Sequence, residues 1–181
     1  MRPSLVSCLI ALSLPLAGCG LKPLYANGSA GGVATMLADI DVAPIEGHAG
    51  WLVRNALRDR FVAAQHGQGE GNRYRLDVRL EGSITGFGVR SDDAVTRERR
   101  TLRARYQLVD GQTGQVLLDA TAAQDAGIDV VGSEYATIAA ENSSLERLAS
   151  GVADQIVARL AVYANRGGPA AAPGVAPPAD R

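Results

Sequence analysis

The chain has 181 residues, 46% of them hydrophobic, and a formal net charge of -1, which is ordinary for a globular domain. Aromatic residues make up only 4%, which argues against the aromatic stacking platforms of proteins that bind single-stranded nucleic acid. With two cysteines and two histidines, a structural zinc site is not expected.

The N-terminal segment, residues 1–18, has the layout of a bacterial secretory signal. A positive charge at Arg2 precedes an apolar stretch that is too short to span a bilayer, and small residues close it. The segment runs Leu-Ala-Gly into Cys19, which is similar to the lipobox of bacterial lipoproteins. That resemblance implies cleavage before Cys19 and attachment of lipid to it. The alternative is a plain secretory signal in which Cys19 is incidental.

The remaining chain divides into three parts by composition. Residues 19–32 are rich in Gly and lack a periodic apolar face, so we predict a lipidated tether. Residues 33–166 carry the periodic segments and are expected to form one folded domain. Residues 167–181 are rich in Pro and Ala and are predicted to be a disordered tail.

Within residues 33–166, the apolar pattern first predicts a strand and then a helix. Residues 35–42 alternate between apolar and polar side chains, as in a half-buried strand. From about residue 50 to residue 65, apolar residues recur at helical spacing. A glycine-rich cluster at 67–71 follows this helix.

Three further segments alternate with period two and are predicted to be strands. The clearest is 74–81, which is expected to continue past Gly82 through Phe87 with a kink or bulge at the glycines. Residues 101–109 and 116–122 form the other two, joined by a hairpin loop at 110–114.

The last predicted element is an amphipathic helix from about Tyr135. Its apolar stripe runs from Leu145 to Tyr163. Ser143 and Glu146 together have the spacing of a capping box, so an irregularity near residue 142 is an open alternative. The order strand, helix, three strands, helix predicts an α+β two-layer sandwich, with two helices on one face of a mainly antiparallel four-stranded sheet.

No catalytic constellation stands out in the sequence. The nucleophile elbow, the zinc-protease helix motif and the phosphate loop are all missing. Asp92-Asp93 resembles a metal-binding or acid-base pair, but a solvated loop between two strands is the favoured interpretation. His48 lies just before a predicted helix, as a loop or cap residue does. We therefore expect no enzymatic activity, no metal and no cofactor beyond the lipid on Cys19.

A cluster of arginines is the one feature that suggests a binding site. From Arg90 to residue 105 there are six positive charges against three negative ones. Guanidinium groups bind phosphate and carboxylate in pairs of hydrogen bonds, so an anionic ligand or partner fits. The alternative is a charged strand that resists edge-to-edge pairing. The candidate binding residues are Arg97, Arg99, Arg100, Arg103 and Arg105. Alternation predicts that four of them lie on the polar face of the sheet and that Arg100 lies at the strand mouth.

Several of these parts coincide in one family. The segment from Gly18 to Tyr25, Gly-Cys-Gly-Leu-Lys-Pro-Leu-Tyr, resembles the start of the lipopolysaccharide-assembly lipoproteins of the LptE family. The predicted order of elements and the segments 135–141 and 153–160 are similar to theirs as well. Leu21 departs from the aromatic residue usual at that position.

The resemblance implies a non-enzymatic protein on the periplasmic side of the outer membrane. Such proteins plug the β-barrel translocon LptD as a heterodimer, help it assemble, and assist delivery of lipopolysaccharide to the outer leaflet. Gly20 after Cys19 is compatible with the outer membrane. An auxiliary lipoprotein of an ABC-type phospholipid transport system is the alternative, and a lipid-anchored hydrolase using His48 is the other class left open.

Overall fold

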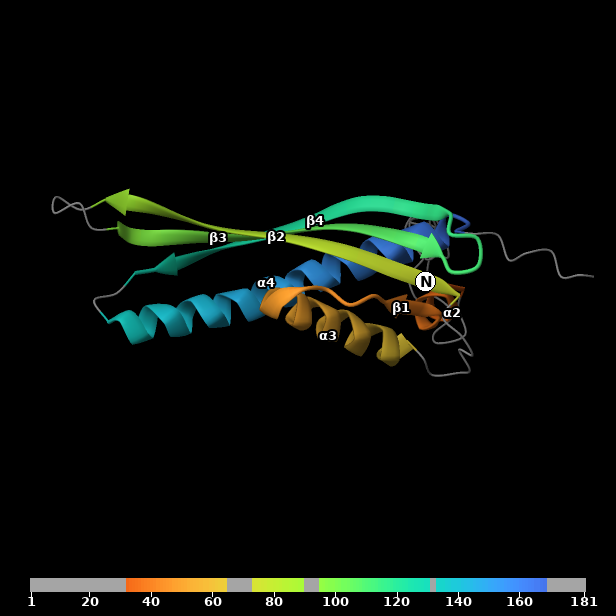
Figure 1. The fold of residues 1–181 in the computed structure, drawn as a ribbon, viewed down its shortest axis with the longest axis horizontal. Helices are drawn as coiled ribbons and strands as arrows, with labels where there is room; N and C mark the ends of the chain where they lie inside the picture. The colour runs from red at the N-terminus through yellow and green to blue at the C-terminus, as the bar shows by residue number, and fades with distance from the viewer. Residues whose placement is uncertain (1–31, 65–72, 90–94, 131–132, 169–181) are drawn as a thin grey trace, which may run out of the picture.

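A computed structural model of the chain describes residues 32–64, 73–89, 95–130 and 133–168. The predicted signal, Cys19, the Pro/Ala-rich tail and the Asp92-Asp93 pair lie outside these residues. Figure 1 shows a long twisted sheet on one side and helices on the other. The predicted α+β sandwich, with helices packed on a sheet, is thus confirmed.

The first element differs from the prediction. Residues expected to be one strand form helix α2 (Gly32–Ala38) followed by the short strand β1 (Ile40–Val42). The side chains of Val33, Met36 and Leu37 are buried, and their spacing of three and four residues suits a helix. The same residues allow an alternating pattern, and packing against α3 and α4 decides in favour of the helix.

The sheet has the order β1-β2-β3-β4 and is mostly antiparallel. β2 (Tyr74–Val89), β3 (Val95–Asp110) and β4 (Val116–Asp129) are longer than the alternating segments predicted, and only β1 pairs in parallel. Pairing of β2 with β3 passes Gly82 without a register shift and skips only Gly88, which has a positive φ of 77°. Glycine adopts that conformation without strain.

The turn between β3 and β4 is held by a side chain. Asp110 accepts hydrogen bonds from the backbone N–H groups of Gln112 and Thr113, at 2.9 and 2.8 Å. These bonds hold the pKa of Asp110 below its usual value, because they favour the charged carboxylate. The predicted hairpin loop is therefore confirmed at this position.

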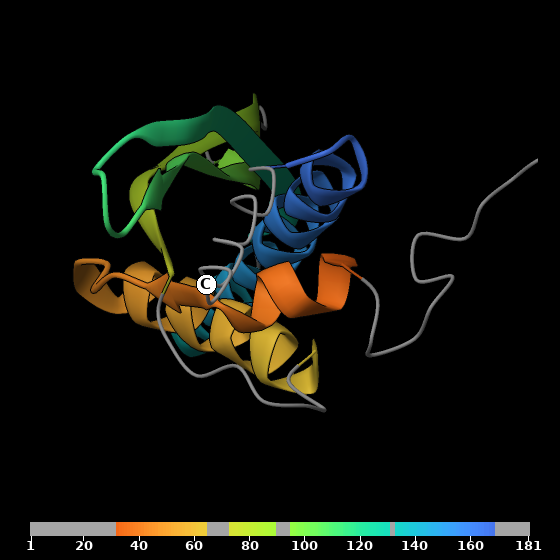
Figure 2. The same cartoon turned by 90° about the vertical axis from the view of Figure 1, so that its right-hand side faces the viewer.

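Two helices, α3 (Gly47–Ala64) and α4 (Glu134–Asn165), cover one face of the sheet, as Figure 2 shows end-on. α4 starts at the predicted place and is one continuous helix, so the capping box at Ser143 is not used. Buried side chains of the helices and of the inner sheet face form one core; those that are fully buried include Leu57, Leu76, Leu102, Tyr106, Leu108, Ile156 and Leu160.

Candidate functional site

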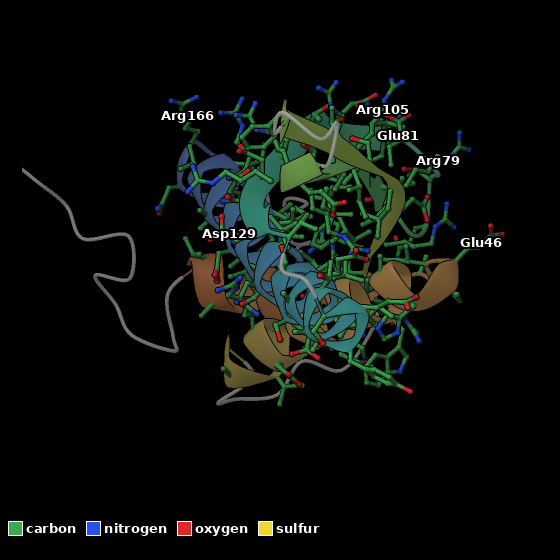
Figure 3. The ribbon with its side chains drawn as sticks, turned by 90° about the vertical axis from the view of Figure 1, so that its left-hand side faces the viewer. Glu46, Arg79, Glu81, Arg105, Asp129 and Arg166 are labelled. Atoms are coloured by element: carbon green, nitrogen blue, oxygen red, sulfur yellow. The ribbon has the colours of Figure 1, made fainter. Side chains whose placement is uncertain are left out.

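The face of the sheet turned away from the helices, here called the outer face, is mostly polar. It is formed by the odd-numbered residues of β2, β3 and β4. Figure 3 shows Arg79, Glu81 and Arg105 projecting from it, away from the helices. Its charged residues are Arg75, Asp77, Arg79, Glu81, Arg97, Arg99, Arg103, Arg105, Asp119, Asp125 and Asp129.

Four of the five predicted arginines lie on the outer face in one row along β3, as their alternation indicates. They are Arg97, Arg99, Arg103 and Arg105, and all four are exposed. Residues two apart along a strand are about 7 Å apart, so this row is about 27 Å long. The arrangement is therefore a stripe of cations, too long to enclose a single phosphate group.

Three of these four arginines already have a carboxylate partner on β4. Arg97 contacts Asp129 at 2.9 Å, and Arg105 contacts Asp119 at 2.9 Å. Arg99 lies 3.9 Å from Asp125 and stacks over the ring of Phe87. These pairs are exposed to solvent, so each adds little stability, but together they neutralise most of the stripe.

The Arg105 pair changes the acidity of its carboxylate. The hydrogen bond from Arg105 and a second one from Gln107 lower the pKa of Asp119, because both favour the charged form. The same contact raises the pKa of Arg105. Arg105 is thus committed to β4 and is less available to an outside anion than its exposure suggests.

Arg103 has no such partner among the described residues. It lies opposite Glu81 in the β2–β3 register without forming an ion pair. Arg79 of β2, opposite Arg105, is also unpaired within the described part of the chain. Sequence reasoning missed Arg79 as a site residue, although alternation placed it on the polar face. Alternation assigns residues to a face, but it does not give the register of β2 with β3. That register decides which β3 side chain lies opposite Arg79.

Arg100 does not join the other arginines. As an even-numbered residue of β3, it lies on the inner face, and its guanidinium donates to the backbone carbonyl of Glu141 in α4 at 2.9 Å. The expectation that it lies at the strand mouth beside the others is therefore wrong. β3 begins five residues before Arg100 and ends ten residues after it, so Arg100 lies within the strand. Its contact fastens α4 to the sheet.

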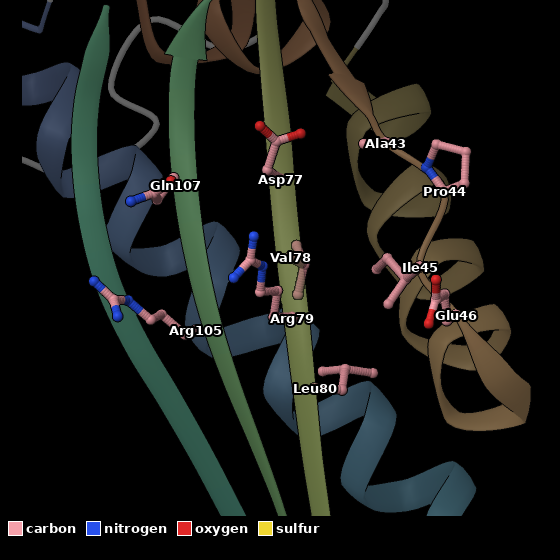
Figure 4. A pocket seen from close by; sticks show the side chains of 10 residues that line it. All are labelled: Ala43, Pro44, Ile45, Glu46, Asp77, Val78, Arg79, Leu80, Arg105 and Gln107. Atoms are coloured by element: carbon pink, nitrogen blue, oxygen red, sulfur yellow. The ribbon is translucent and has the colours of Figure 1, made fainter.

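A hollow of about 760 Å³ lies beside the stripe, between β2 and the chain that connects β1 to α3. Figure 4 shows Pro44 and Glu46 of the connection on one side of β2, while Arg79 is turned toward β3 and Arg105 toward β4. Val78, Leu80 and Ile45 supply apolar wall. The hollow is open and mixed in character, which suits a polypeptide or a glycolipid surface better than an enclosed small molecule.

Of the candidate catalytic residues, only His48 lies in the described part of the chain. His48 is exposed at the start of α3 and stacks on the exposed ring of Trp51. In the described ranges, no three His, Cys, Asp or Glu side chains are grouped so as to hold a metal ion. Across those same ranges, none of the helices combines the length and the apolar character that crossing a membrane requires.

Residues 37–160 match the family model described as "LptE: Lipopolysaccharide-assembly", which covers more than half of the chain. The chain belongs to the LptE family. The family is one of non-enzymatic, outer-membrane-associated lipoproteins, and the predicted membership of the LptE family is confirmed. The N-terminal segment that also resembles the family lies outside the matched residues. No curated protein matches this LptE-family chain in sequence.

Solved structures of other lipoproteins have the same fold. A putative lipoprotein from Caulobacter crescentus is 27% identical, with a TM-score of 0.60 over 77% of this chain and all of its own. A minor lipoprotein from Acinetobacter baumannii is 14% identical, with a TM-score of 0.53 over 70% of this chain and 93% of its own. Lipoprotein B from Nitrosomonas europaea is 12% identical, with a TM-score of 0.53 over 71% of this chain and 83% of its own. The last two show the fold alone.

Proposed function

We propose that this protein is the lipid-anchored partner of the LptD barrel: it occupies the barrel lumen from the periplasmic side, helps the barrel assemble, and assists lipopolysaccharide delivery to the outer leaflet. The observation that carries this proposal is the LptE family match over residues 37–160. The work is mechanical, since it consists of filling a lumen and presenting a binding surface.

The outer face supports this proposal physically. The interior of a transmembrane barrel is hydrated and polar, so a protein inside it needs a charged surface rather than an apolar one. Here positive and negative side chains alternate across the strands and pair with one another. A self-neutralised surface can lie against a polar wall of either sign without leaving many charges unpaired.

The unpaired arginines are the best candidates for contact with lipopolysaccharide. Its phosphate groups require cations that are free to donate, and Arg79 and Arg103 have no carboxylate partner in the described residues. The diagonal neighbours of an antiparallel pair lie about 7–8 Å apart, close enough for both guanidinium groups to contact one phosphorylated headgroup. Arg97, Arg99 and Arg105 would have to break existing pairs first.

The attachment to the membrane is proposed to come from lipid on Cys19. A single acyl chain holds a protein only marginally, whereas several chains make the attachment close to permanent. No other cofactor enters the proposal. The tether would connect the lipid to α2, which opens the described part of the fold.

Binding to purified lipopolysaccharide tests the role of the outer face. We expect the double variant Arg79→Ala/Arg103→Ala to bind about tenfold more weakly than wild type, since the two free cations are lost. Arg97→Ala/Arg99→Ala removes the same charge from paired positions and should change affinity less than about threefold. Equal losses in both variants would show that only net charge matters, and no loss in either would remove the outer face from the binding site.

A further inference from the structure

One long side of β2 is left without a neighbouring strand. β1 pairs with β2 only from Ile40 to Val42, and its last contact is the bond from the backbone N–H of Ala43 to the carbonyl of Leu76, at 3.1 Å. β2 continues for thirteen residues beyond Leu76, to Val89. We call the side of β2 from Val78 to Gly86 that faces away from β3 the open edge.

The direction of the backbone groups along the open edge follows from alternation. Tyr74 donates to Asp39 and Leu76 accepts from Ala43, so even-numbered residues of β2 turn their N–H and C=O groups away from β3. Val78, Leu80, Gly82, Ile84 and Gly86 continue this series. No described residue bonds these groups on that side.

The opposite edge of the sheet, on β4, is covered. Gln155 of α4 accepts from the N–H of Ala123 and donates to its carbonyl, both at 3.2 Å, so one side-chain amide takes the place of a neighbouring strand. α4 also packs along β4. The β4 edge is therefore in contact with α4, whereas the open edge of β2 is not paired in the described chain.

The open edge also lacks the usual obstacles to strand addition. Proteins protect exposed edges with Pro, Lys, bulges or covering segments. From Val78 to Gly86 there is no Pro or Lys, and pairing with β3 is regular. Gly82 and Gly86 leave the backbone accessible, and the segment is about 27 Å long at strand spacing.

We propose that the open edge is an acceptor site on which an extended segment of the barrel protein adds as a fifth strand beside β2. This inference rests on the proposed function for the identity of the partner. Alternating free N–H and C=O groups are complementary to an extended polypeptide backbone. The segment must lie outside the wall strands of the barrel, because strands in a closed barrel have no free edge.

The side chains beside the open edge describe the segment that fits. On the outer face, unpaired Arg79 would pair favourably with an acidic residue of the added strand. On the inner face, half-buried Leu80 and exposed Ile84 would pack against apolar residues of the added strand. The hollow between β2 and the β1–α3 connection provides the space in which the segment enters.

A proline substitution with a matched control tests this site. Gly82→Pro removes an N–H that points off the sheet while leaving the bonds to β3 intact, and an added Cβ there meets nothing closer than 3.9 Å. Gly127→Pro does the same on the opposite edge, because Gly127 has the same parity as Ala123 and has open space around it. Each full-length variant is tagged, purified from detergent-solubilised outer membranes and checked for folding by its melting curve.

If the inference holds, Gly82→Pro reduces the amount of co-purified barrel protein at least about tenfold, while Gly127→Pro stays within about twofold of wild type. A folded Gly82→Pro protein that retains the barrel as wild type does would overturn the inference and leave the proposed function standing. Wild type that brings down no barrel would contradict the proposed function itself.

Photo-crosslinking gives an answer even if Gly82→Pro fails to fold. A benzophenone side chain replaces Ser83 in otherwise unchanged chain, and Thr121 of β4 serves as the control position. The inference predicts crosslinks from position 83 to one short stretch of the barrel protein and none to that stretch from position 121. Crosslinks to a second copy of this chain, to lipopolysaccharide, or to scattered wall residues would refute it.

Discussion

Neighbouring arginines on β3 have different roles because a strand turns successive side chains to opposite faces. Arg100 lies on the inner face and bonds to the backbone of α4, whereas Arg103 lies on the outer face without a partner in the described chain. Charge alone does not distinguish these two residues. Parity along the strand does, and it separates a structural contact from a candidate binding residue.

Gly50 is required by a close approach of backbones. A Cβ at this position would lie 2.5 Å from the carbonyl oxygen of Ile45, a backbone atom that cannot turn away. Gly50→Ala should therefore lower the free energy of unfolding by about 1–3 kcal/mol, although Ala favours a helix by about 1 kcal/mol. Urea unfolding provides the measurement.

Gly151→Ala is the matched control for Gly50→Ala. Gly151 is also helical, but its added Cβ would meet only the flexible side chain of Gln124, at 3.3 Å. We expect this variant to be as stable as wild type or more so. Equal destabilisation by both substitutions would show that the close approach at Gly50 is not the cause.

The Asp119 carboxylate should make a pH-dependent contribution to stability. Its pKa in the folded state lies below the usual 3.8, chiefly because Arg105 bonds to it. The contribution is therefore complete above the unfolded pKa and is lost as pH falls through the lower folded pKa. Carboxyl NMR titration should give Asp119 a pKa below 3.8 that rises in Arg105→Ala and stays low in Arg103→Ala. A pKa unaffected by Arg105→Ala would contradict the assigned pair.

At the scale of elements, the strands with one polar face and one apolar face were predictable, because period two is clear in β2, β3 and β4. The continuation of β2 past Gly82 was predicted as well, but the start of β3 at Val95 and the end of β4 at Asp129 were not. Residues 123–129 lack strict alternation and are fixed by pairing with β3. Part of α2 was predicted to be a strand because its seven residues satisfy both periods. Packing between α2, α3 and α4 is a tertiary effect that no local pattern contains.

The candidate site was predictable in part for the same reason. Alternation correctly placed four of the five arginines on one face, and it also placed Arg79 there. Whether an arginine is free depends on the register with β2 and β4, which sets the pairs Arg97–Asp129 and Arg105–Asp119. Register is a property of the folded sheet, so the sequence indicated a cluster without showing which members were already neutralised.

Arg60 links α3 to α4 through polar contacts. Its guanidinium donates to the hydroxyl of Ser150 at 3.0 Å and contacts Asp154, linking residues ninety positions apart. Arg60→Ala should destabilise the fold by about 1–2 kcal/mol, with the exposed Asp154 contact counting for little of it. Arg58→Ala, on the exposed side of α3, should leave the melting temperature unchanged. If both variants melt alike, Arg60 does not hold the helices together.

At the scale of the whole molecule, the fold is elongated. α4 is about 48 Å long at helical rise, and the β2–β3 pair runs beside it. In Figure 1, α2 lies at one end, near the end of α4, and the far tips of β2 and β3 lie at the other. The proposed tether would therefore hold the end of the molecule at which α2 lies, and the strand tips would point away from it.

Attachment through that tether should depend on one cysteine. Cys19→Ala should leave the precursor uncleaved and without lipid, because the acceptor of the lipid is lost. Cys8→Ala, within the predicted signal, is the matched control and should be cleaved and lipidated as wild type is. Gel mobility and labelling with radioactive palmitate measure both. Cleavage and labelling of Cys19→Ala equal to those of wild type would refute the proposed anchor.

The most direct test of the lipopolysaccharide-assembly role is surface labelling of newly made lipopolysaccharide in cells depleted of this protein. We predict that labelled lipopolysaccharide at the cell surface falls sharply on depletion and recovers when the wild-type chain is expressed again, while phospholipid transport between the membranes continues. Unchanged lipopolysaccharide at the surface, with phospholipid transport impaired instead, would contradict the account and favour an auxiliary role in a phospholipid transporter.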